Sequence, residues 1–116
     1  MLFVNYPKCT TCVKARKFLE STGHGFDNRD IKTHNPTVQE LQTWYQQSGL
    51  PLKKFFNTSG NVYKELQLKD KLADMSEEAQ LNLLATDGML VKRPLLITDK
   101  GVAVGYNEAT WSALLP

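Results

Sequence analysis

The first 31 residues have the pattern of a strand, a helix and a second strand, and this order constrains the fold more than any other part of the chain. Residues 2–6 are a short apolar run bounded by a proline, which is typical of a β-strand. Between residues 10 and 22 apolar side chains recur at helical spacing, and Gly23 follows as a stop. Residues 25–31 can form the second strand. Such a unit predicts two parallel strands joined by a right-handed crossover.

The rest of the chain predicts a helical middle, a β-hairpin and a last helix. The segment Thr37–Glu40 has the form of a capping box at the start of a helix. Two strand-like runs, 95–98 and 102–105, are joined by Asp99-Lys100-Gly101, which predicts a three-residue turn with positive φ at the glycine. Asn107 can cap the last helix. The predicted order is β, α, β, a helical insert, β, β, α.

Length and charge limit the class of protein. A chain of 116 residues has the size of one domain with one hydrophobic core. The apolar runs are too short to cross a bilayer and the start lacks the pattern of a secretory signal, so we expect neither membrane association nor export. The net charge is +2, with basic and acidic residues alternating, which does not favour direct binding of nucleic acid. One close cysteine pair suits a reducing compartment, so we expect a cytoplasmic location.

Cys9 and Cys12 are the only cysteines, and they form a CxxC motif between the first strand and the first helix. If this helix begins at Thr10 or Thr11, Cys9 lies at its N-terminal edge and Cys12 in its first turn. Backbone N–H groups and the helix dipole stabilise a thiolate there, which lowers the thiol pKa from its ordinary value of about 8.5. Lys8 adds a positive charge nearby. We therefore predict a redox-active disulfide, with Cys9 as the nucleophile and Cys12 as the resolving thiol.

Two other interpretations of the pair remain open. A structural zinc ion needs about four ligands, and the chain adds only His24 and His34, at no recognised ligand spacing, so we expect no metal site. The cysteines can also be small core residues, which fits Cys12, on the apolar face of its helix, better than Cys9.

Three segments make the chain resemble the arsenate reductase and Spx family of thioredoxin-like proteins. They are CTTCVKARKFLE at 9–20, GMLVKRPLLI at 88–97 and VGYNEATW at 104–111, and the resemblance covers essentially the whole chain. It implies an α/β fold, with one thioredoxin-like domain over residues 1–116. In that domain a four-stranded mixed sheet (βαβ, then ββα) carries an all-helical insert at about 37–87. The small CxxC-bearing arsenate reductase-like proteins of this family resemble the chain most.

The resemblance implies a thiol-disulfide oxidoreductase or thiol-dependent reductase that needs no metal or organic cofactor. Its catalytic residues are then Cys9, Cys12 and Arg93, of which Arg93 stabilises the thiolate or an anionic substrate. Electrons come from a cellular thiol reductant of the thioredoxin or glutathione system. The alternative for Arg93 is a solvated charge beside Lys92.

The same resemblance implies that the bond before Pro94 is cis and that Pro94 faces the redox cysteines, next to a backbone edge that can pair with a disulfide partner. The residues expected to contact substrate or partner are Lys8, Thr10, Thr11 and Pro94. We expect Tyr6, Trp44 and Trp111 to belong to the core instead.

Arsenate itself is doubtful as the substrate. In the arsenate reductases an arginine lies four positions after the catalytic cysteine, and further arginines come from the insert and the hairpin. Here Val13 takes the first of these positions and the insert segment Asn57–Gly60 has no arginine, so that only Arg93 remains. A trianion is held best by several bidentate guanidinium groups.

The alternative function is that of an Spx-like redox-switched transcriptional regulator. That branch binds the C-terminal domain of the RNA polymerase α subunit, and CTTC, KRPLLI and VGYNE resemble it. The segment QQSGLPLKKFF at 46–56 is basic and apolar where Spx is acidic. A third interpretation is a binding or structural protein in which the CxxC motif is vestigial.

Overall fold

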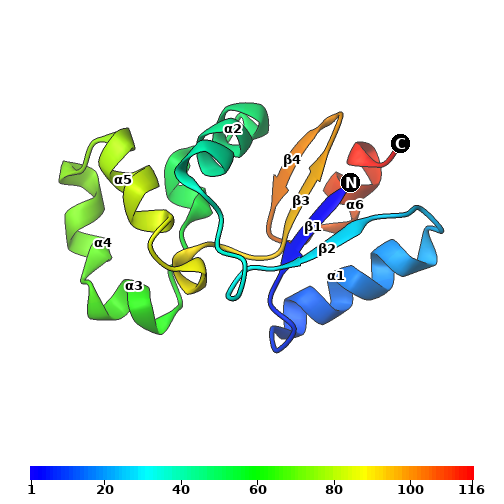
Figure 1. The fold of residues 1–116 in the computed structure, drawn as a ribbon, viewed down its shortest axis with the longest axis horizontal. Helices are drawn as coiled ribbons and strands as arrows, with labels where there is room; N and C mark the ends of the chain where they lie inside the picture. The colour runs from blue at the N-terminus through cyan, green and yellow to red at the C-terminus, as the bar shows by residue number, and fades with distance from the viewer.

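The computed structural model describes residues 1–116, which form a four-stranded mixed sheet flanked by helices (Figure 1). The strands are β1 (Leu2–Asn5), β2 (Asp27–Asp30), β3 (Leu95–Thr98) and β4 (Gly101–Val104). Their order in the sheet is β2-β1-β3-β4. β1 is parallel to β2 and antiparallel to β3, and β3 is antiparallel to β4. The predicted mixed sheet is therefore confirmed, including the parallel pairing of the two strands that flank the first helix.

The helices follow the predicted order, with several short helices in the middle of the chain. The α-helices are α1 (Thr10–Ser21), α2 (Val38–Ser48), α3 (Asn61–Glu65), α4 (Leu68–Lys71), α5 (Glu77–Leu84) and α6 (Glu108–Leu114), and the 3₁₀ helices are η1 (Leu52–Phe55), η2 (Leu72–Asp74) and η3 (Gly88–Leu90). The capping box of α2 is present as predicted, because the Glu40 N–H donates to Thr37 Oγ1 at 3.1 Å and the Thr37 N–H donates to Glu40 Oε1 at 3.0 Å. None of these helices is long and apolar enough to cross a membrane.

Side chains alternate between the two faces of the sheet, so each face has its own apolar cluster. Phe3, Leu96 and Ala103 pack with side chains of α1 and α6. Their neighbours Val4, Leu95 and Val102 belong to a cluster of 16 buried residues that continues through α2 and the short helices. Figure 1 shows α3, α4 and α5 at the end of the molecule opposite to α1 and α6. The insert is therefore joined to the sheet by a shared apolar core.

The hairpin turn is shorter than predicted. Gly101 pairs with Thr98 as the first residue of β4, so that Asp99 and Lys100 alone form the turn. The requirement for glycine is confirmed, because Gly101 has a φ of 152°, a region that other residues rarely adopt.

After α5, Asp87 begins a new helix, η3. The Met89 N–H donates to Asp87 Oδ1 at 2.8 Å, which caps η3. A Cβ atom on Gly88 would lie 1.9 Å from the carbonyl oxygen of Ile31. Only glycine therefore lets η3 lie against the chain that leaves β2.

Candidate active site at the CxxC motif

Cys9 and Cys12 lie where β1 passes into α1. Cys9 is the N-cap residue of α1, with extended backbone angles (φ −84°, ψ 122°). Its N–H donates to the Tyr6 carbonyl at 3.0 Å, and its carbonyl accepts from the Val13 N–H at 3.0 Å. The helix thus begins at Thr10, as predicted, and the N–H groups of its first turn, which have no partner within the helix, lie next to the Cys9 sulfur.

The two thiols differ in exposure. Cys9 is partly exposed, whereas Cys12 is 2% exposed. The core interpretation is therefore correct for the burial of Cys12 but not for Cys9. A nucleophile must be reached by its substrate, so Cys9 is the thiol that an incoming sulfur can contact.

The pKa of Cys9 is lower than that of an ordinary thiol. Partial burial of the sulfur is the largest single influence and opposes ionisation. It is outweighed by hydrogen bonds from the Cys12 thiol and the backbone N–H groups of Cys12 and Thr11, together with the positive charge of Arg93. These are the influences expected at a helix N-terminus, except that the charge comes from Arg93 and not from the neighbouring Lys8.

The pKa of Cys12 is raised to about 12. Burial is the main cause, and the hydrogen bond to Cys9 and the negative charge of its thiolate add to it. The backbone N–H of Tyr6 acts in the opposite direction. In the reduced protein one thiol is therefore prepared to ionise, while the other stays protonated and donates to it.

Arg93 lies over the CxxC loop and is not a solvated charge. Its guanidinium carbon is 5.3 Å from the centre of the Tyr6 ring, and its Nη1 donates to the Met89 carbonyl at 3.2 Å. Its Nε is buried without a partner. The exposed charge is that of Lys92, so the alternative interpretation of Arg93 is wrong. The bond between Arg93 and Pro94 is cis, as predicted.

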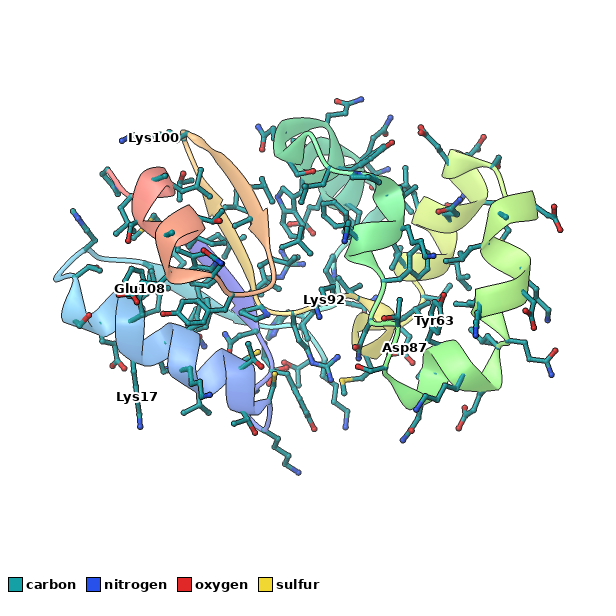
Figure 2. The ribbon with its side chains drawn as sticks, turned by 180° about the vertical axis from the view of Figure 1, so that it is seen from behind. Lys17, Tyr63, Asp87, Lys92, Lys100 and Glu108 are labelled. Carbon is teal, nitrogen blue, oxygen red and sulfur yellow. The ribbon has the colours of Figure 1, made fainter.

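A hollow of about 500 Å³ opens beside Cys9 and separates α1 from the insert. Its lining includes Thr11 from α1, Lys92 and Arg93 from the chain before β3, and Asn57, Ser59, Gly60 and Asn61 of the insert. No carboxylate lines it. In Figure 2 Lys92 lies in the middle of the molecule, between the sheet and the insert. A ligand in this hollow meets the reactive thiol on one side. On the other sides it meets cationic and neutral polar groups together with the apolar side chains of Val62 and Met89.

The structure brings together some of the predicted site residues. Cys9, Thr11 and Arg93 line the hollow, and Cys12 lies beneath Cys9. Pro94 is buried directly after Arg93. Lys8 and Thr10 are exposed and do not line the hollow.

Two residues of the site, Tyr6 and Met89, are not among the predicted site residues. Tyr6 is expected in the core, yet its ring lies against the Arg93 guanidinium and its backbone contacts both cysteines. Tyr6 lies directly before Pro7, at the start of the CxxC loop, and this position is a signal in the sequence that Tyr6 belongs to the site. Met89, which holds Arg93 through a backbone carbonyl, gave no signal, because any residue supplies that group.

A CxxC pair at the start of the first helix, a cis-proline before the third strand and a four-stranded mixed sheet together define a thioredoxin-like protein. The chain belongs to the ArsC family, whose model matches residues 4–114. The family resemblance of the sequence and the predicted thioredoxin-like fold are thereby confirmed.

Relatives of the chain include both regulators and a protein without an assigned role. The chain is 53% identical over 108 residues to the uncharacterized protein YusI of Bacillus subtilis, with 93% of this chain and 92% of YusI covered. It is 28% identical to the regulatory protein MgsR of B. subtilis, with coverage of 92% and 83%. It is 24% identical to the global transcriptional regulator Spx of Lactiplantibacillus plantarum, with coverage of 95% and 82%.

Solved structures show the same fold. An ArsC family related protein from Bacteroides fragilis is 54% identical and superposes with a TM-score of 0.95 over 98% of this chain and 96% of its own. An arsenate reductase from Vibrio cholerae is 26% identical, with a TM-score of 0.87 over 99% and 98%. The family therefore contains proteins named as enzymes and proteins named as regulators, and the choice between them depends on the site.

Proposed function

We propose that this protein is a thiol-disulfide oxidoreductase in which Cys9 is the nucleophile, Cys12 the resolving thiol and Arg93 the group that stabilises the thiolate. The observation that carries the proposal is the contrast between the two thiols. Cys9 has a lowered pKa and opens to a hollow, whereas Cys12 is buried beside it with a pKa of about 12. Reactive cysteines have partly exposed, electropositive surroundings of this kind.

The reaction follows from this arrangement. The Cys9 thiolate attacks one sulfur of a substrate disulfide, so that the substrate S–S bond breaks and a mixed disulfide with Cys9 forms. The departing sulfur leaves with the bonding electron pair and takes a proton from solvent. Cys12 then loses its proton and attacks the Cys9 sulfur, which releases the second substrate thiol and leaves a Cys9–Cys12 disulfide. Two electrons have passed to the substrate, and a cellular thiol reductant of the thioredoxin or glutathione system restores both thiols.

The high pKa of Cys12 is compatible with its resolving role. Two of its causes are the hydrogen bond to Cys9 and the charge of the Cys9 thiolate. Both disappear when Cys9 is part of a mixed disulfide, because its sulfur is then neutral. The Tyr6 N–H, which favours the Cys12 thiolate, remains. Cys12 therefore ionises more readily at the step in which it must attack.

The proposal is tested with bis(2-hydroxyethyl) disulfide, a small uncharged substrate. We expect the wild type to release two thiols per turnover in a coupled glutathione assay. Cys12→Ser should accumulate a stable 2-mercaptoethanol adduct on Cys9, seen by intact mass, and Cys9→Ser should form no adduct. Equal turnover by the wild type and Cys9→Ser would exclude the proposed mechanism.

A redox-switched regulator that binds the RNA polymerase α subunit is the second candidate. It is favoured by the relatives named MgsR and Spx, which align with more than nine-tenths of this chain. The measurement that separates the two is binding of the purified C-terminal domain of the α subunit to the reduced and the oxidised protein. Saturable binding that changes with the state of Cys9 and Cys12, without turnover of disulfides, would favour the regulator.

A further inference from the structure

A second hollow adjoins the one beside Cys9. It has a volume of about 700 Å³, and Lys92 lines both hollows. Thr58 lines the second hollow, while its neighbours Asn57 and Ser59 line the first. The two hollows therefore meet at Lys92, and together they are called the groove.

The charges along this groove are all positive. Lys53, Lys54 and Lys92 are exposed in the second hollow, and Arg93 and Lys92 lie in the first. No aspartate or glutamate lines either hollow, although the chain has 12 acidic residues against 14 lysines and arginines. None of these lysines forms a salt bridge. The positive field of the groove is thus left for a ligand to neutralise.

Apolar residues line the second hollow together with its lysines. Leu50, Pro51 and Phe56 contribute to the second hollow. A small anion near Cys9 meets Arg93 and Lys92, whereas Lys53 and Lys54 belong to the second hollow. Only a longer ligand, with apolar as well as acidic groups, uses both hollows at once. The backbone N–H and carbonyl of Arg93, which form no hydrogen bond within the protein, can pair with such an extended chain.

We infer that the groove binds an acidic segment of a cysteine-containing protein partner, whose carboxylates lie on Lys53, Lys54 and Lys92 while its sulfur reacts with Cys9. This inference rests on the proposed function, because it assigns the class of substrate to the same site. In the reaction the Cys9 thiolate bonds to the partner's disulfide sulfur, and the other sulfur of that disulfide leaves with the electron pair.

The test uses two synthetic peptides that carry one cysteine as a mixed disulfide with 5-thio-2-nitrobenzoate. In the first peptide aspartate and glutamate flank the cysteine on both sides, and in the second asparagine and glutamine replace them. Attack by Cys9 on the peptide sulfur releases coloured thionitrobenzoate. The rate is measured in a Cys12→Ser background, with Lys53→Gln/Lys54→Gln as the test variant and Lys69→Gln/Lys71→Gln, two exposed lysines of α4 outside the groove, as the matched control.

We expect the acidic peptide to react about tenfold faster than its neutral counterpart at low salt, with the ratio falling as salt screens the charges. The test variant should lose most of this ratio and keep its rate with the neutral peptide, whereas the control should keep both. Equal rates for the two peptides, or an equal loss of the ratio in both lysine variants, overturns the acidic partner and leaves the thiol chemistry intact. The acidic partner is also overturned if Lys53→Gln/Lys54→Gln keeps the wild-type ratio of the two peptide rates. A Cys9 that reacts with neither peptide overturns this inference and the proposed function together.

Discussion

The guanidinium of Arg93 is held over the Tyr6 ring with its Nε buried and without a partner. Leaving a buried donor unpaired costs about 1–3 kcal/mol, and more where the group is charged. The contact with Tyr6 and the single bond to Met89 offset part of this cost. What the position provides is a positive charge that lowers the pKa of Cys9. The unpaired donor and the charge beside Cys9 support the proposal that Arg93 stabilises the thiolate.

The first prediction concerns the effect of this charge on Cys9. The thiolate is the reactive form, so the rate of Cys9 alkylation by iodoacetamide rises with pH through the pKa of Cys9. We expect a midpoint below that of a free thiol in the wild type. Arg93→Gln removes a charge that favours the thiolate and should shift the midpoint upward, which slows the reaction at neutral pH.

Lys100→Gln is the control, since Lys100 lies in the β3–β4 turn (Figure 2), which is beside the start of β1, whereas the cysteines follow the end of β1. It should leave the midpoint where it is in the wild type. Mass spectrometry after digestion confirms that Cys9 and not Cys12 is alkylated. Superimposable profiles for wild type and Arg93→Gln would show that Arg93 does not act on the thiol.

The sequence predicts the single residues of the site only where they are neighbours in the chain. Cys9 and Cys12 are placed correctly, because a strand followed by a proline and a helical pattern determines where α1 begins. Tyr6 and Met89 are missed because Arg93 reaches them through tertiary packing, and neither a ring nor a backbone carbonyl indicates its partner in the sequence.

The N-terminus of α1 lacks the side-chain cap that α2, α5, η3 and α6 have. Side chains of Thr37, Ser76, Asp87 and Asn107 cap α2, α5, η3 and α6. Cys9 occupies the N-cap of α1, which has no side-chain cap and no acidic residue in its first turn. The donors that a serine or aspartate would satisfy are available to the Cys9 thiolate. The N-terminus of α1 can therefore stabilise a thiolate at Cys9.

The second prediction concerns α2, where Glu40 joins the capping box to Arg29. The Arg29 Nη2 donates to Glu40 Oε1 at 2.9 Å, and this hydrogen-bonded ion pair is the main cause that lowers the pKa of Glu40 to about 2. A carboxylate with a lowered pKa stabilises the fold above its ordinary pKa of about 4.3, and this contribution is lost as the pH falls toward 2. Glu40→Gln should therefore reduce the free energy of unfolding at pH 7 by about 1 kcal/mol, since the pair is partly solvated.

The difference in the free energy of unfolding between wild type and Glu40→Gln should decrease below about pH 4.3, because the wild-type carboxylate is then progressively protonated. Urea denaturation at pH 7 and at pH 3 measures this difference. Glu20→Gln, on the exposed side of α1 and outside any salt bridge, is the control and should change stability little at either pH. A difference that stays constant with pH would indicate that the ion pair does not stabilise the fold.

The caps of α2 and α6 were predictable because a cap and its helix are adjacent in the chain. The role of Asp87 was not, since it depends on Gly88 approaching Ile31, more than fifty positions earlier. The turn at Asp99-Lys100 is one residue shorter than the predicted turn for a similar reason. Pairing of Gly101 with Thr98 extends the ladder by one residue beyond the run of strand-forming residues.

At the scale of the whole molecule, the hollow beside Cys9 depends on how the insert lies against the sheet. One wall comes from α1 and the other from residues at the start of α3, so neither half forms the hollow alone. The 16-residue cluster that runs from Val4 in the sheet to Leu81 and Leu84 in α5 fixes this arrangement. We propose that residues 1–116 form one folding unit, as the length of the chain suggests.

The last prediction tests this proposal with the two tryptophans, which lie in different clusters. Trp44 belongs to the cluster shared by the sheet and the insert, and Trp111 to the one beneath α1 and α6. Both are buried, at 5% and 0% exposure, so unfolding changes the fluorescence of each. Trp111→Phe leaves Trp44 as the reporter, and Trp44→Phe leaves Trp111. In each variant we expect the urea midpoint from fluorescence to coincide with that from far-ultraviolet circular dichroism, because a shared core unfolds in one transition.

The fluorescence and circular dichroism midpoints are compared within one variant, so the loss of stability that the substitution causes affects both equally. If the insert unfolded separately, the circular dichroism curve would show two steps, with the Trp44 signal following one and the Trp111 signal the other. The hollow at Cys9 would then be lost in the first step while the sheet persisted. Iodoacetamide alkylation of Cys9 in the same urea series gives an independent check, since a single folding unit changes its thiol reactivity at the same midpoint.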